Sequence, residues 1–362
     1  MPGRPRAVVA MSGGVDSSVA AAILVEQGFD VVGLFMRMGV EARGPEDLAT
    51  TGRPACCSAA DAADARFVAG VLNIPFFALN FSAEFGGIIR HFADEYAHGR
   101  TPNPCILCNE RLKFGRLLEY ALATGAEFVA TGHYARVENT AEGIRLLRAA
   151  DRAKDQSYVL FGLGREALAR TRFPIGHLSK NEVRRKAGQL GLPVHSKPDS
   201  ADICFAPDRD YARVVGTYRP DALRPGEVHD PDGRVVGTHE GIARYTIGQR
   251  HGLRIAMGVP MYVLNIDAQT NVVTIGPREC LLRDGLLASN VRWLIDEPAG
   301  PVQGEVQIRY THTAAPATIE PMPGGAARVR FRWPQTAITP GQAAVFYDGD
   351  RVLGGGWIER IL

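Results

Sequence analysis

The stretch Ala10-Met-Ser-Gly-Gly-Val-Asp-Ser-Ser18 decides the fold, because it joins a strand pattern to a helix pattern. Residues 7–10 are a short apolar run that predicts a strand, and residues 16–27 repeat apolar side chains at helical spacing. Gly13 and Gly14 allow a backbone to approach a ligand closely. The serine hydroxyls and the free amide groups of a helix N-terminus add donors. We therefore predict an anion-binding loop suited to pyrophosphate.

The acidic residue of this loop, Asp16, is unexpected beside phosphate groups, since like charges repel. Its presence is explained if Mg²⁺ bridges the carboxylate and the phosphates. The alternative is that Asp16 simply favours the positive end of the helix. The loop differs from the two common nucleotide motifs, because no Lys follows the glycines and the GxGxxG spacing is absent. We favour a nucleotide site over a plain glycine turn with a helix cap.

Strand and helix patterns alternate through the first half of the chain. Strands are predicted at residues 7–10, 31–36, 76–79 and 127–131, and helices at 16–27, 59–72, 84–97 and 108–124. The segment from Arg100 to Pro104 contains two prolines and should be irregular. A β-α-β-α order predicts an α/β fold with a doubly wound parallel sheet.

The second half of the chain is rich in short strand patterns separated by Gly, Pro and Asp. Strand-like runs occupy residues 261–267, 272–275, 304–310, 328–333, 343–347 and 352–358. Many short strands are typical of a barrel or a sandwich. We expect a nucleotide-binding and catalytic domain at residues 1–207, a small mixed central domain at 208–283 and a C-terminal β-barrel at 284–362.

Composition limits the classes of function. The 362 residues are 46% hydrophobic and 22% charged, with a formal net charge of +2, as in soluble globular proteins. A uniformly basic coat for nucleic acid is excluded, but a local basic groove is not. No apolar run is long enough to span a membrane, and no uninterrupted apolar segment follows the N-terminus. We expect a cytoplasmic protein.

The six cysteines lie at Cys56-Cys57, Cys105-x-x-Cys108, Cys204 and Cys280. In a reducing compartment they are not expected to form structural disulfides. The CxxC pair suggests metal or redox chemistry, and the alternative is a set of buried small hydrophobic residues. Cys108 follows a proline-rich turn and is expected to begin a helix, where the helix N-terminus would lower its thiol pKa.

Two resemblances sharpen this interpretation. The SGGVDSS loop resembles that of the PP-loop ATP pyrophosphatases, which cleave ATP between the α and β phosphates and activate a substrate oxygen as its adenylate. The segment Gly99-Arg-Thr-Pro-Asn-Pro-Cys-Ile-Leu-Cys-Asn-Glu-Arg-Leu-Lys-Phe114 resembles the cysteine loop of the bacterial tRNA-specific 2-thiouridylases. Further segments are similar to that family, in its order, over nearly the whole chain: 130–134, 154–158, 200–204, 245–250, 309–310 and 339–347.

The resemblance implies a site and a reaction. Cys108 would be the nucleophile and Cys204 the persulfide carrier, with a transient disulfide between them. ATP would be held by Ala10, Met11, Ser12, Gly13, Gly14, Val15, Asp16, Ser17, Met36 and Gly132, with Mg²⁺ at the phosphates. The target base would face Asn103, Pro104 and Cys105, and tRNA would contact His133, Lys154, Asp155, Gln156, Arg309, Tyr310 and Gln342. The product would be 2-thiouridine at the wobble position of the anticodon stem-loop, made by a monomer that receives sulfur from a persulfide donor protein.

One departure from the family leaves the sulfur chemistry open. Some members carry Asp where this chain has Cys105, and a thiol titrates far above a carboxyl group. Cys105, Cys108 and Cys204 would make a three-thiolate set able to hold an iron–sulfur cluster with one open iron. We favour the persulfide route without a cluster and without a resident metal. An ammonia-transferring PP-loop ligase and a nonenzymatic RNA-binding protein are the remaining alternatives.

A basic strand adds a candidate RNA surface. Arg328, Arg330 and Arg332 alternate along one predicted strand and should therefore share a face. That face would meet phosphates or, alternatively, would be the solvated edge of a sheet.

Overall fold

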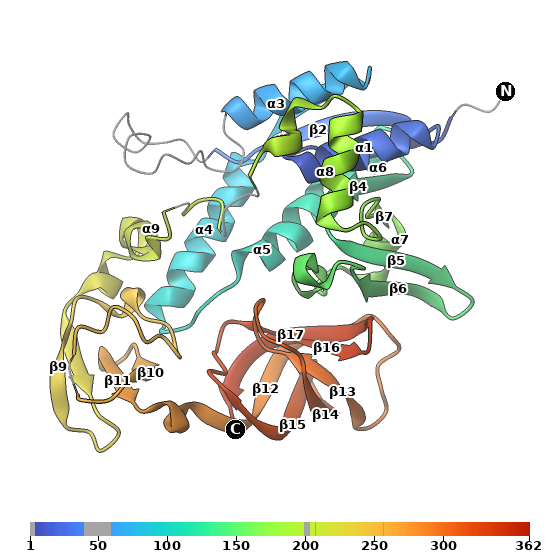
Figure 1. Ribbon diagram of the computed structural model, residues 1–362. Helices are drawn as coiled ribbons and strands as arrows, with labels where there is room; N and C mark the ends of the chain where they lie inside the picture. Colours follow the sequence, from blue (N-terminus) through green and yellow to red (C-terminus); the bar gives the residue numbers. More distant parts are fainter. Residues whose placement is uncertain (1–3, 40–58, 199–202, 207, 256) are drawn as a thin grey trace. The chain divides into compact units, whose positions relative to one another are not determined.

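The computed structural model describes residues 4–39, 59–198, 203–206, 208–255 and 257–362 (Figure 1). The chain forms two compact units. The first, called unit 1, comprises Met1–Gly87, Cys105–Arg209 and Asp350–Val352. The second, called unit 2, comprises Ile88–Pro104, Asp210–Gly349 and Leu353–Leu362.

Unit 1 is organised around a five-stranded parallel sheet of order β3-β2-β1-β4-β7. Its strands are β1 (Arg6–Ala10), β2 (Asp30–Arg37), β3 (Phe76–Asn80), β4 (Phe128–Thr131) and β7 (Thr171–Arg172). The apolar β1 lies in the centre, where Val8 pairs with Val32 on one side and Val129 on the other. A strand buried on both faces needs such an apolar sequence. The predicted doubly wound parallel sheet is confirmed.

Unit 1 also contains helices, several of which lie along this sheet (Figure 1). They are α1 (Val15–Glu26), α3 (Ala59–Val71), α5 (Pro104–Leu107), the π-helix η1 (Cys108–Arg116), α6 (Leu117–Ala123), α7 (Arg165–Ala169) and α8 (Lys180–Gln189), with 3₁₀ turns η2 (Arg152–Lys154), η3 (Ser157–Val159) and η4 (Pro193–Ser196). A further helix, α4 (Ser82–Ala97), begins in unit 1 and belongs to unit 2 from Ile88 onward. One buried cluster joins Val9 of β1 to Val19 of α1, Val68 of α3 and Val183 of α8. These three helices therefore share one apolar core with the sheet. A hairpin of β5 (Ala135–Thr140) and β6 (Gly143–Arg148) follows β4.

The strand order places the candidate site. β2 and β3 lie on one side of β1, and β4 and β7 lie on the other, so the order of the strands reverses at β1. Ligands of parallel sheets bind at such a switch point. The loop after β1 and the loop after β4 lie at the same carboxyl edge. The first contains Gly13 and Gly14, and the second contains Gly132.

Unit 2 contains α9 (Tyr211–Tyr218) and two β structures (Figure 1). A four-stranded sheet of order β10-β11-β8-β9 contains β8 (Gly226–His229), β9 (Val235–His239), β10 (Tyr262–Asp267) and β11 (Val272–Gly276). The turns η5 (Pro220–Leu223), η6 (Ile242–Arg244) and η7 (Arg278–Leu281) connect these elements. This is the expected small mixed part.

The C-terminal strands close into a barrel. They are β12 (Leu282–Trp293), β13 (Val302–Gln307), β14 (Ala315–Met322), β15 (Ala326–Thr336), β16 (Ala343–Asp348) and β17 (Arg351–Ile361). Their order is β12-β15-β14-β13-β16-β17, and β12 also pairs with β17, with Leu286 opposite Ile361. Closure removes the exposed edges that an open sheet would leave. The predicted barrel is confirmed.

Strand β15 shows the expected alternation. Val329 and Phe331 are buried in the barrel core, whereas Arg330 and Arg332 are exposed and Arg328 is half-buried. Arg328 donates to Glu320 Oε2 at 3.0 Å, and the guanidinium of Arg332 lies 4.6 Å from the ring centre of Trp333. The three arginines thus share the outer face of the barrel.

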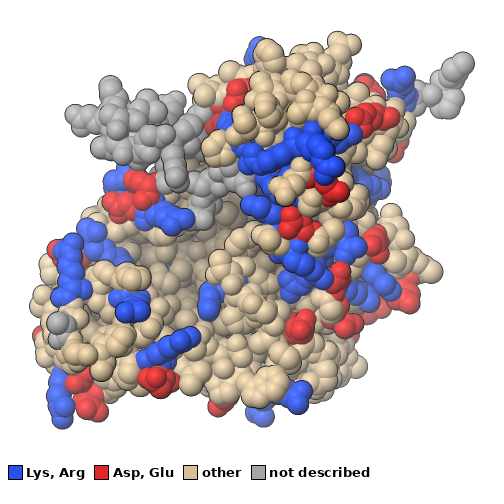
Figure 2. Space-filling model, viewed as in Figure 1, with Lys and Arg blue, Asp and Glu red and all other residues tan. Residues whose placement is uncertain are grey.

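Charge is mixed over the molecule. Figure 2 shows Lys and Arg interspersed with Asp and Glu on the face in view, which agrees with the small net charge. Within the described ranges, no helix has the length and apolar character needed to cross a membrane.

Candidate active site

The loop between β1 and α1 is held by its own serines. Ser17 Oγ accepts a hydrogen bond from Ser12 N at 3.1 Å and lies 3.1 Å from the carbonyl oxygen of Gly14, to which it donates. Ser18 Oγ donates to the same carbonyl at 2.9 Å. Gly14 is the N-cap of α1 and has no side chain to cap the helix, so the first amide groups of α1 can face an anion.

Glycine is required at Gly13. Its φ of +73° lies in the left-handed region, and a Cβ there would lie 2.2 Å from the carbonyl oxygen of Asp61. The expected ATP residues gather at this edge: residues 10–17 follow β1, Met36 is buried near the end of β2, and Gly132 follows β4. This loop could therefore cradle a polyphosphate.

The carboxylate of Asp16 is held by two groups from other elements. Lys180 Nζ donates to both carboxylate oxygens at 2.8 Å, and the Tyr134 hydroxyl donates to Oδ1 at 2.7 Å. Lys180 is buried at the first position of α8, where Ser179 and Glu182 form a capping box. A cation is unfavourable at a helix N-terminus. The ion pair with Asp16 compensates for that position and neutralises the acid beside the loop.

We expect Lys180→Ala to weaken Mg-ATP binding roughly tenfold, because Asp16 would lose two of the three hydrogen bonds that fix its carboxylate beside the loop. Calorimetric titration of the variant would measure this. The matched control is Lys186→Ala, which removes a lysine of the same helix that pairs with Glu26 at 2.7 Å. Equal ATP affinity in the two variants would contradict the assigned role.

A second lysine fastens the loop from the other side. Lys197 Nζ donates to the carbonyl oxygen of Gly13 at 3.0 Å, to Asp61 Oδ1 at 2.7 Å and to Asp64 Oδ2 at 2.6 Å. Burial opposes the charge on Lys197, but hydrogen bonds to the two carboxylates outweigh it and raise its pKa. The ammonium therefore stays charged and fixes the Gly13 peptide to α3.

The helix that carries the CxxC pair begins earlier than expected. It starts at Pro104 as α5 and continues at Cys108 as the π-helix η1. Proline suits the first helical position because its missing N–H would have no partner there. Cys105 therefore occupies the first turn, and Cys108 lies one turn further in. The π-helix is rare in proteins, and where it occurs it is often at a functional site.

The expected lowering of the Cys108 pKa is wrong in this structure. Burial raises the pKa of the Cys108 thiol, and the nearby Lys113 ammonium opposes this only in part. The helix N-terminus does not act on Cys108 because the helix begins at Pro104. Lys113, which sequence analysis did not select, is the group that favours the thiolate.

His133 is buried and held on both ring nitrogens. Its Nε2 lies 3.3 Å from Lys113 Nζ and its Nδ1 lies 2.6 Å from Thr131 Oγ1. Burial first, and then the Lys113 charge, lower the pKa of His133 well below its ordinary value. With Lys113 donating to Nε2, we assign the proton of the neutral ring to Nδ1, which donates to Thr131.

Stability should depend on pH through His133. Well above pH 6.5 the ring is neutral in the folded and unfolded chains. Below that value the unfolded chain binds a proton that the folded chain excludes, so the free energy of unfolding should fall by up to about 1.4 kcal/mol per pH unit. Urea unfolding measured between pH 7.5 and 5 gives the free energy of unfolding at each pH. This free energy should fall less steeply with decreasing pH for His133→Gln than for wild type. Identical slopes would contradict this, and His251→Gln, at an exposed position, is the control.

The other expected thiol, Cys204, is half-buried in a turn of unit 1. The next residue, Phe205, is buried and packs edge-to-face on Phe85 with ring centres 5.9 Å apart. Residues 200–202, which belong with Cys204 to one of the segments similar to the family, lie outside the described residues. The Cys56-Cys57 pair lies outside them as well.

The three-thiolate alternative requires the three cysteines to lie close together. Among the described residues, which include Cys105, Cys108 and Cys204, no three His, Cys, Asp or Glu side chains are gathered to hold a metal ion. The three cysteines as arranged here do not fit a cluster site.

Some residues expected at tRNA have internal roles as well. The Asp155 carboxylate accepts hydrogen bonds from Ala149 N at 2.9 Å and from Ser157 Oγ at 2.8 Å, and pairs with Arg148 at 3.1 Å. Gln156 Oε1 accepts from Tyr134 N at 2.9 Å. These contacts shape the turn after β6, on which Lys154 is half-buried.

The remaining expected tRNA residues lie in unit 2. Tyr310 is exposed, Arg309 Nη1 donates to the carbonyl oxygen of Thr336 at 3.2 Å, and Gln342 Nε2 donates to that of Thr101 at 2.8 Å. Asn103 is half-buried and Pro104 buried.

Known proteins align with nearly the whole length of this chain. Residues 5–208 match the family model described as the tRNA methyl transferase HUP domain, residues 213–277 the tRNA methyl transferase PRC-barrel domain, and residues 283–358 the aminomethyltransferase beta-barrel domain. The tRNA-specific 2-thiouridylase MnmA of Geotalea uraniireducens is 49% identical over 359 residues, which cover 99% of this chain and 96% of the relative. The chain belongs to the tRNA-specific 2-thiouridylase family.

Two further relatives of that name agree. The 2-thiouridylase of Geobacter metallireducens is 49% identical and that of Clostridium perfringens 45% identical, and the alignments cover 99% of this chain and 98% and 99% of those relatives. Within this 2-thiouridylase, sequence analysis missed Lys180, Lys197 and Tyr134, which hold the phosphate loop. One signal was available: Lys180 follows Ser179 in a capping-box pattern, where a basic residue is unexpected.

Proposed function

We propose that the protein is a tRNA 2-thiouridylase that uses ATP to activate the wobble uridine and replaces its O2 with sulfur. The observation that carries this proposal is the serine-held, glycine-lined loop at the β1–β4 switch point of a 2-thiouridylase-family chain that also bears Cys108 and Cys204. The loop supports adenylation, and paired thiols support sulfur transfer without a cofactor.

The first step is adenylation. The uridine O2 attacks the α-phosphorus of ATP, the N3 proton is lost and pyrophosphate leaves. The amide groups at the N-terminus of α1 and the Ser12 hydroxyl would face the phosphates. Mg²⁺, when bound, neutralises phosphate charge. Asp16, whose carboxylate is oriented by hydrogen bonds from Lys180 and Tyr134, would be the residue that holds the ion.

The second step is sulfur transfer. Cys204 is loaded as a persulfide by a donor protein. The Cys108 thiolate attacks the inner sulfur of that persulfide, forms a Cys108–Cys204 disulfide and releases hydrosulfide. Hydrosulfide adds to C2 of the base, and AMP leaves with the original oxygen. A cellular thiol then reduces the disulfide.

The other assignments follow from this reaction. Residues 1–207 would bind ATP and perform the chemistry, residues 208–283 would connect, and residues 284–362 would bind the anticodon stem-loop. Asn103, Pro104 and Cys105 would face the base, while His133, Lys154, Asp155, Gln156, Arg309, Tyr310 and Gln342 would contact tRNA. We propose a monomer that acts in the cytoplasm.

The test is anaerobic incubation of the protein with unmodified tRNA, Mg-ATP and a persulfide donor, followed by mass spectrometry of the nucleosides. The expected result is 2-thiouridine, with AMP and pyrophosphate formed only when tRNA is present. ATP turnover without tRNA and without a thiolated nucleoside would overturn the proposal in favour of a small-substrate ligase.

A further inference from the structure

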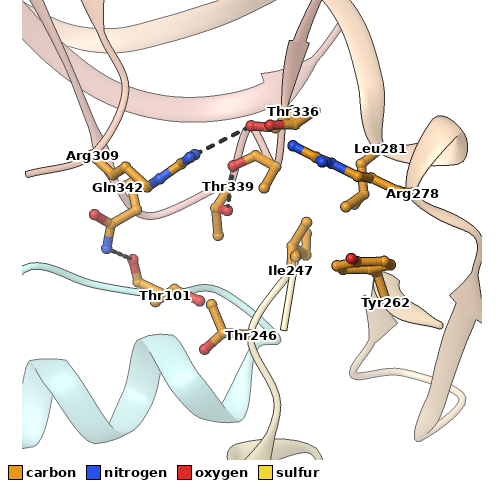
Figure 3. Close-up of a pocket in the computed structure, with 12 residues that line it drawn as sticks. Thr101, Thr246, Ile247, Tyr262, Arg278, Leu281, Arg309, Thr336, Thr339 and Gln342 are labelled. Atoms are coloured by element: carbon orange, nitrogen blue, oxygen red, sulfur yellow. Dashed lines mark hydrogen bonds between the residues drawn. The ribbon is translucent and has the colours of Figure 1, made fainter. Parts of the chain in front are cut away.

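Unit 2 contains a pocket of about 520 Å³ (Figure 3). It lies among the segment before the CxxC helix, the four-stranded sheet and the loop after β15. Its volume falls in the range of about 300–1,000 Å³ that is typical of small-molecule pockets. Its wall includes Thr101, Gly248, Tyr262, Arg278, Arg309 and Ala337.

Two guanidinium groups line this pocket. Arg309 donates to the carbonyl oxygen of Thr336 at 3.2 Å. Figure 3 shows the guanidinium of Arg278 directed toward the same loop from the other side. Planar guanidinium groups match phosphate oxygens with paired hydrogen bonds. The pocket therefore offers an anion two positive partners.

A buried hydroxyl in the pocket wall lacks a partner. Thr101 Oγ1 is buried and has no hydrogen-bond partner among the described residues, although its backbone is held: its N donates to Pro340 O at 2.9 Å and its O accepts from Gln342 at 2.8 Å. An unsatisfied buried hydroxyl costs free energy unless a ligand or water completes it. Because this oxygen has almost no accessible surface, a ligand in the pocket can reach it only when the Thr101 side chain rotates toward the cavity.

The loop that carries Thr336 is strained. Ala337 has a φ of +55°, in the left-handed region that is unfavourable for alanine. A Cβ added at Gly248 would lie 2.5 Å from the Cβ of Ala337, so the glycine at this position leaves room for Ala337. Strained backbone persists where surrounding structure enforces it, and it clusters at binding sites.

We propose that this pocket binds one nucleotide of the RNA substrate other than the target uridine. Its phosphate lies between Arg278 and Arg309, and its base stacks on the half-buried ring of Tyr262. The Thr101 side chain rotates toward the cavity, and its Oγ1 then completes its hydrogen bonding on the base or ribose edge. Proteins read single-stranded RNA loops in this way, with splayed bases on aromatic rings. The choice of tRNA as the source of the nucleotide rests on the proposed function. The contributions of Thr101, Tyr262 and Arg278 rest on the geometry of the pocket alone.

The test measures tRNA affinity at several salt concentrations. Arg278→Gln should weaken binding about tenfold and reduce the slope of log affinity against log salt by roughly 0.7–0.9. Tyr262→Ala should weaken binding about tenfold through lost stacking. Thr101→Val should weaken binding without lowering the melting temperature of the free protein, because it removes an unsatisfied hydroxyl. Arg234→Gln, whose side chain is 78% exposed, is the matched control and should bind as wild type.

The outcomes separate the claims. Wild-type affinity and salt slope in all three pocket variants would overturn the inference. Ribonucleoside 5′-monophosphates that bind in an Arg278-dependent way, with tRNA affinity unchanged by Arg278→Gln, would overturn the RNA source and leave a free-nucleotide site. The same protein preparation is assayed for 2-thiouridine. Failure there overturns the proposed function, whereas Arg278-dependent RNA binding would still support the pocket.

Discussion

Replacing Cys108 or Cys204 with serine is expected to lower 2-thiouridine formation by about a thousandfold or more, because a hydroxyl neither carries a persulfide nor attacks one. Pyrophosphate release should continue in both variants, since adenylation precedes sulfur transfer. A single-turnover assay with unmodified tRNA and a persulfide donor measures both products.

The remaining cysteines provide the controls for this prediction. Cys280→Ser changes a half-buried thiol of unit 2 and should leave the yield unchanged. Cys105→Ser should also keep the yield, with no iron in the protein. If Cys105→Ser lost both product and bound iron, a cluster would replace the persulfide route. Full sulfur transfer by Cys204→Ser would exclude Cys204 as the carrier.

The raised pKa of Cys108 adds a pH dependence to the same assay. Burial raises the pKa of this thiol further above neutral pH, and the Lys113 ammonium opposes that effect in part. The rate of the sulfur-transfer step should therefore rise with pH as the thiolate forms. Lys113→Gln would raise the Cys108 pKa further and displace the rate profile to higher pH.

Local sequence signals predicted the central parts of the fold well. The apolar run before Ser12 and the helical repeat after Gly14 are properties of contiguous residues, so β1 and α1 are found where they were expected. Pairing between distant strands was harder to predict. The strand β14 carries Pro316 and Pro321, which lack the N–H that a ladder uses, and sequence analysis did not predict it.

In the candidate site too, contiguous residues were predicted and partners distant along the chain were missed. The phosphate loop is contiguous and was predicted from its glycines and serines. Its ionic partners are distant along the chain: Lys180 is 164 residues from Asp16, and Lys197 is 136 residues from Asp61. Nothing in either local sequence specifies such a pair. The direction of the Cys108 pKa was wrong for a related reason, since burial depends on packing that one helix turn does not reveal.

The second large effect is expected at Gly132, where β4 ends beside the phosphate loop. A Cβ added there would lie 2.5 Å from Ser17 N and 2.6 Å from the carbonyl carbon of Asp16, both backbone atoms of the first turn of α1. Backbone cannot rotate away as a side chain can, so the N-terminus of α1 must move. A shift of about 1 Å in positioning groups can cost about a hundredfold in rate.

Gly132→Ala should therefore lower ATP-dependent pyrophosphate release about a hundredfold, with a loss of about 1–3 kcal/mol in the free energy of unfolding from overpacking. The matched control is Gly188→Ala on the exposed face of α8, where an added Cβ meets no atom within 4 Å. That change should raise stability by about 0.5–1 kcal/mol, as alanine does for a glycine inside a helix. A folded Gly132→Ala protein with wild-type ATP affinity and pyrophosphate release would show that the close approach of β4 to α1 does not position the phosphates. Loss of ATP binding in a protein that still melts cooperatively and still binds tRNA would show that it does.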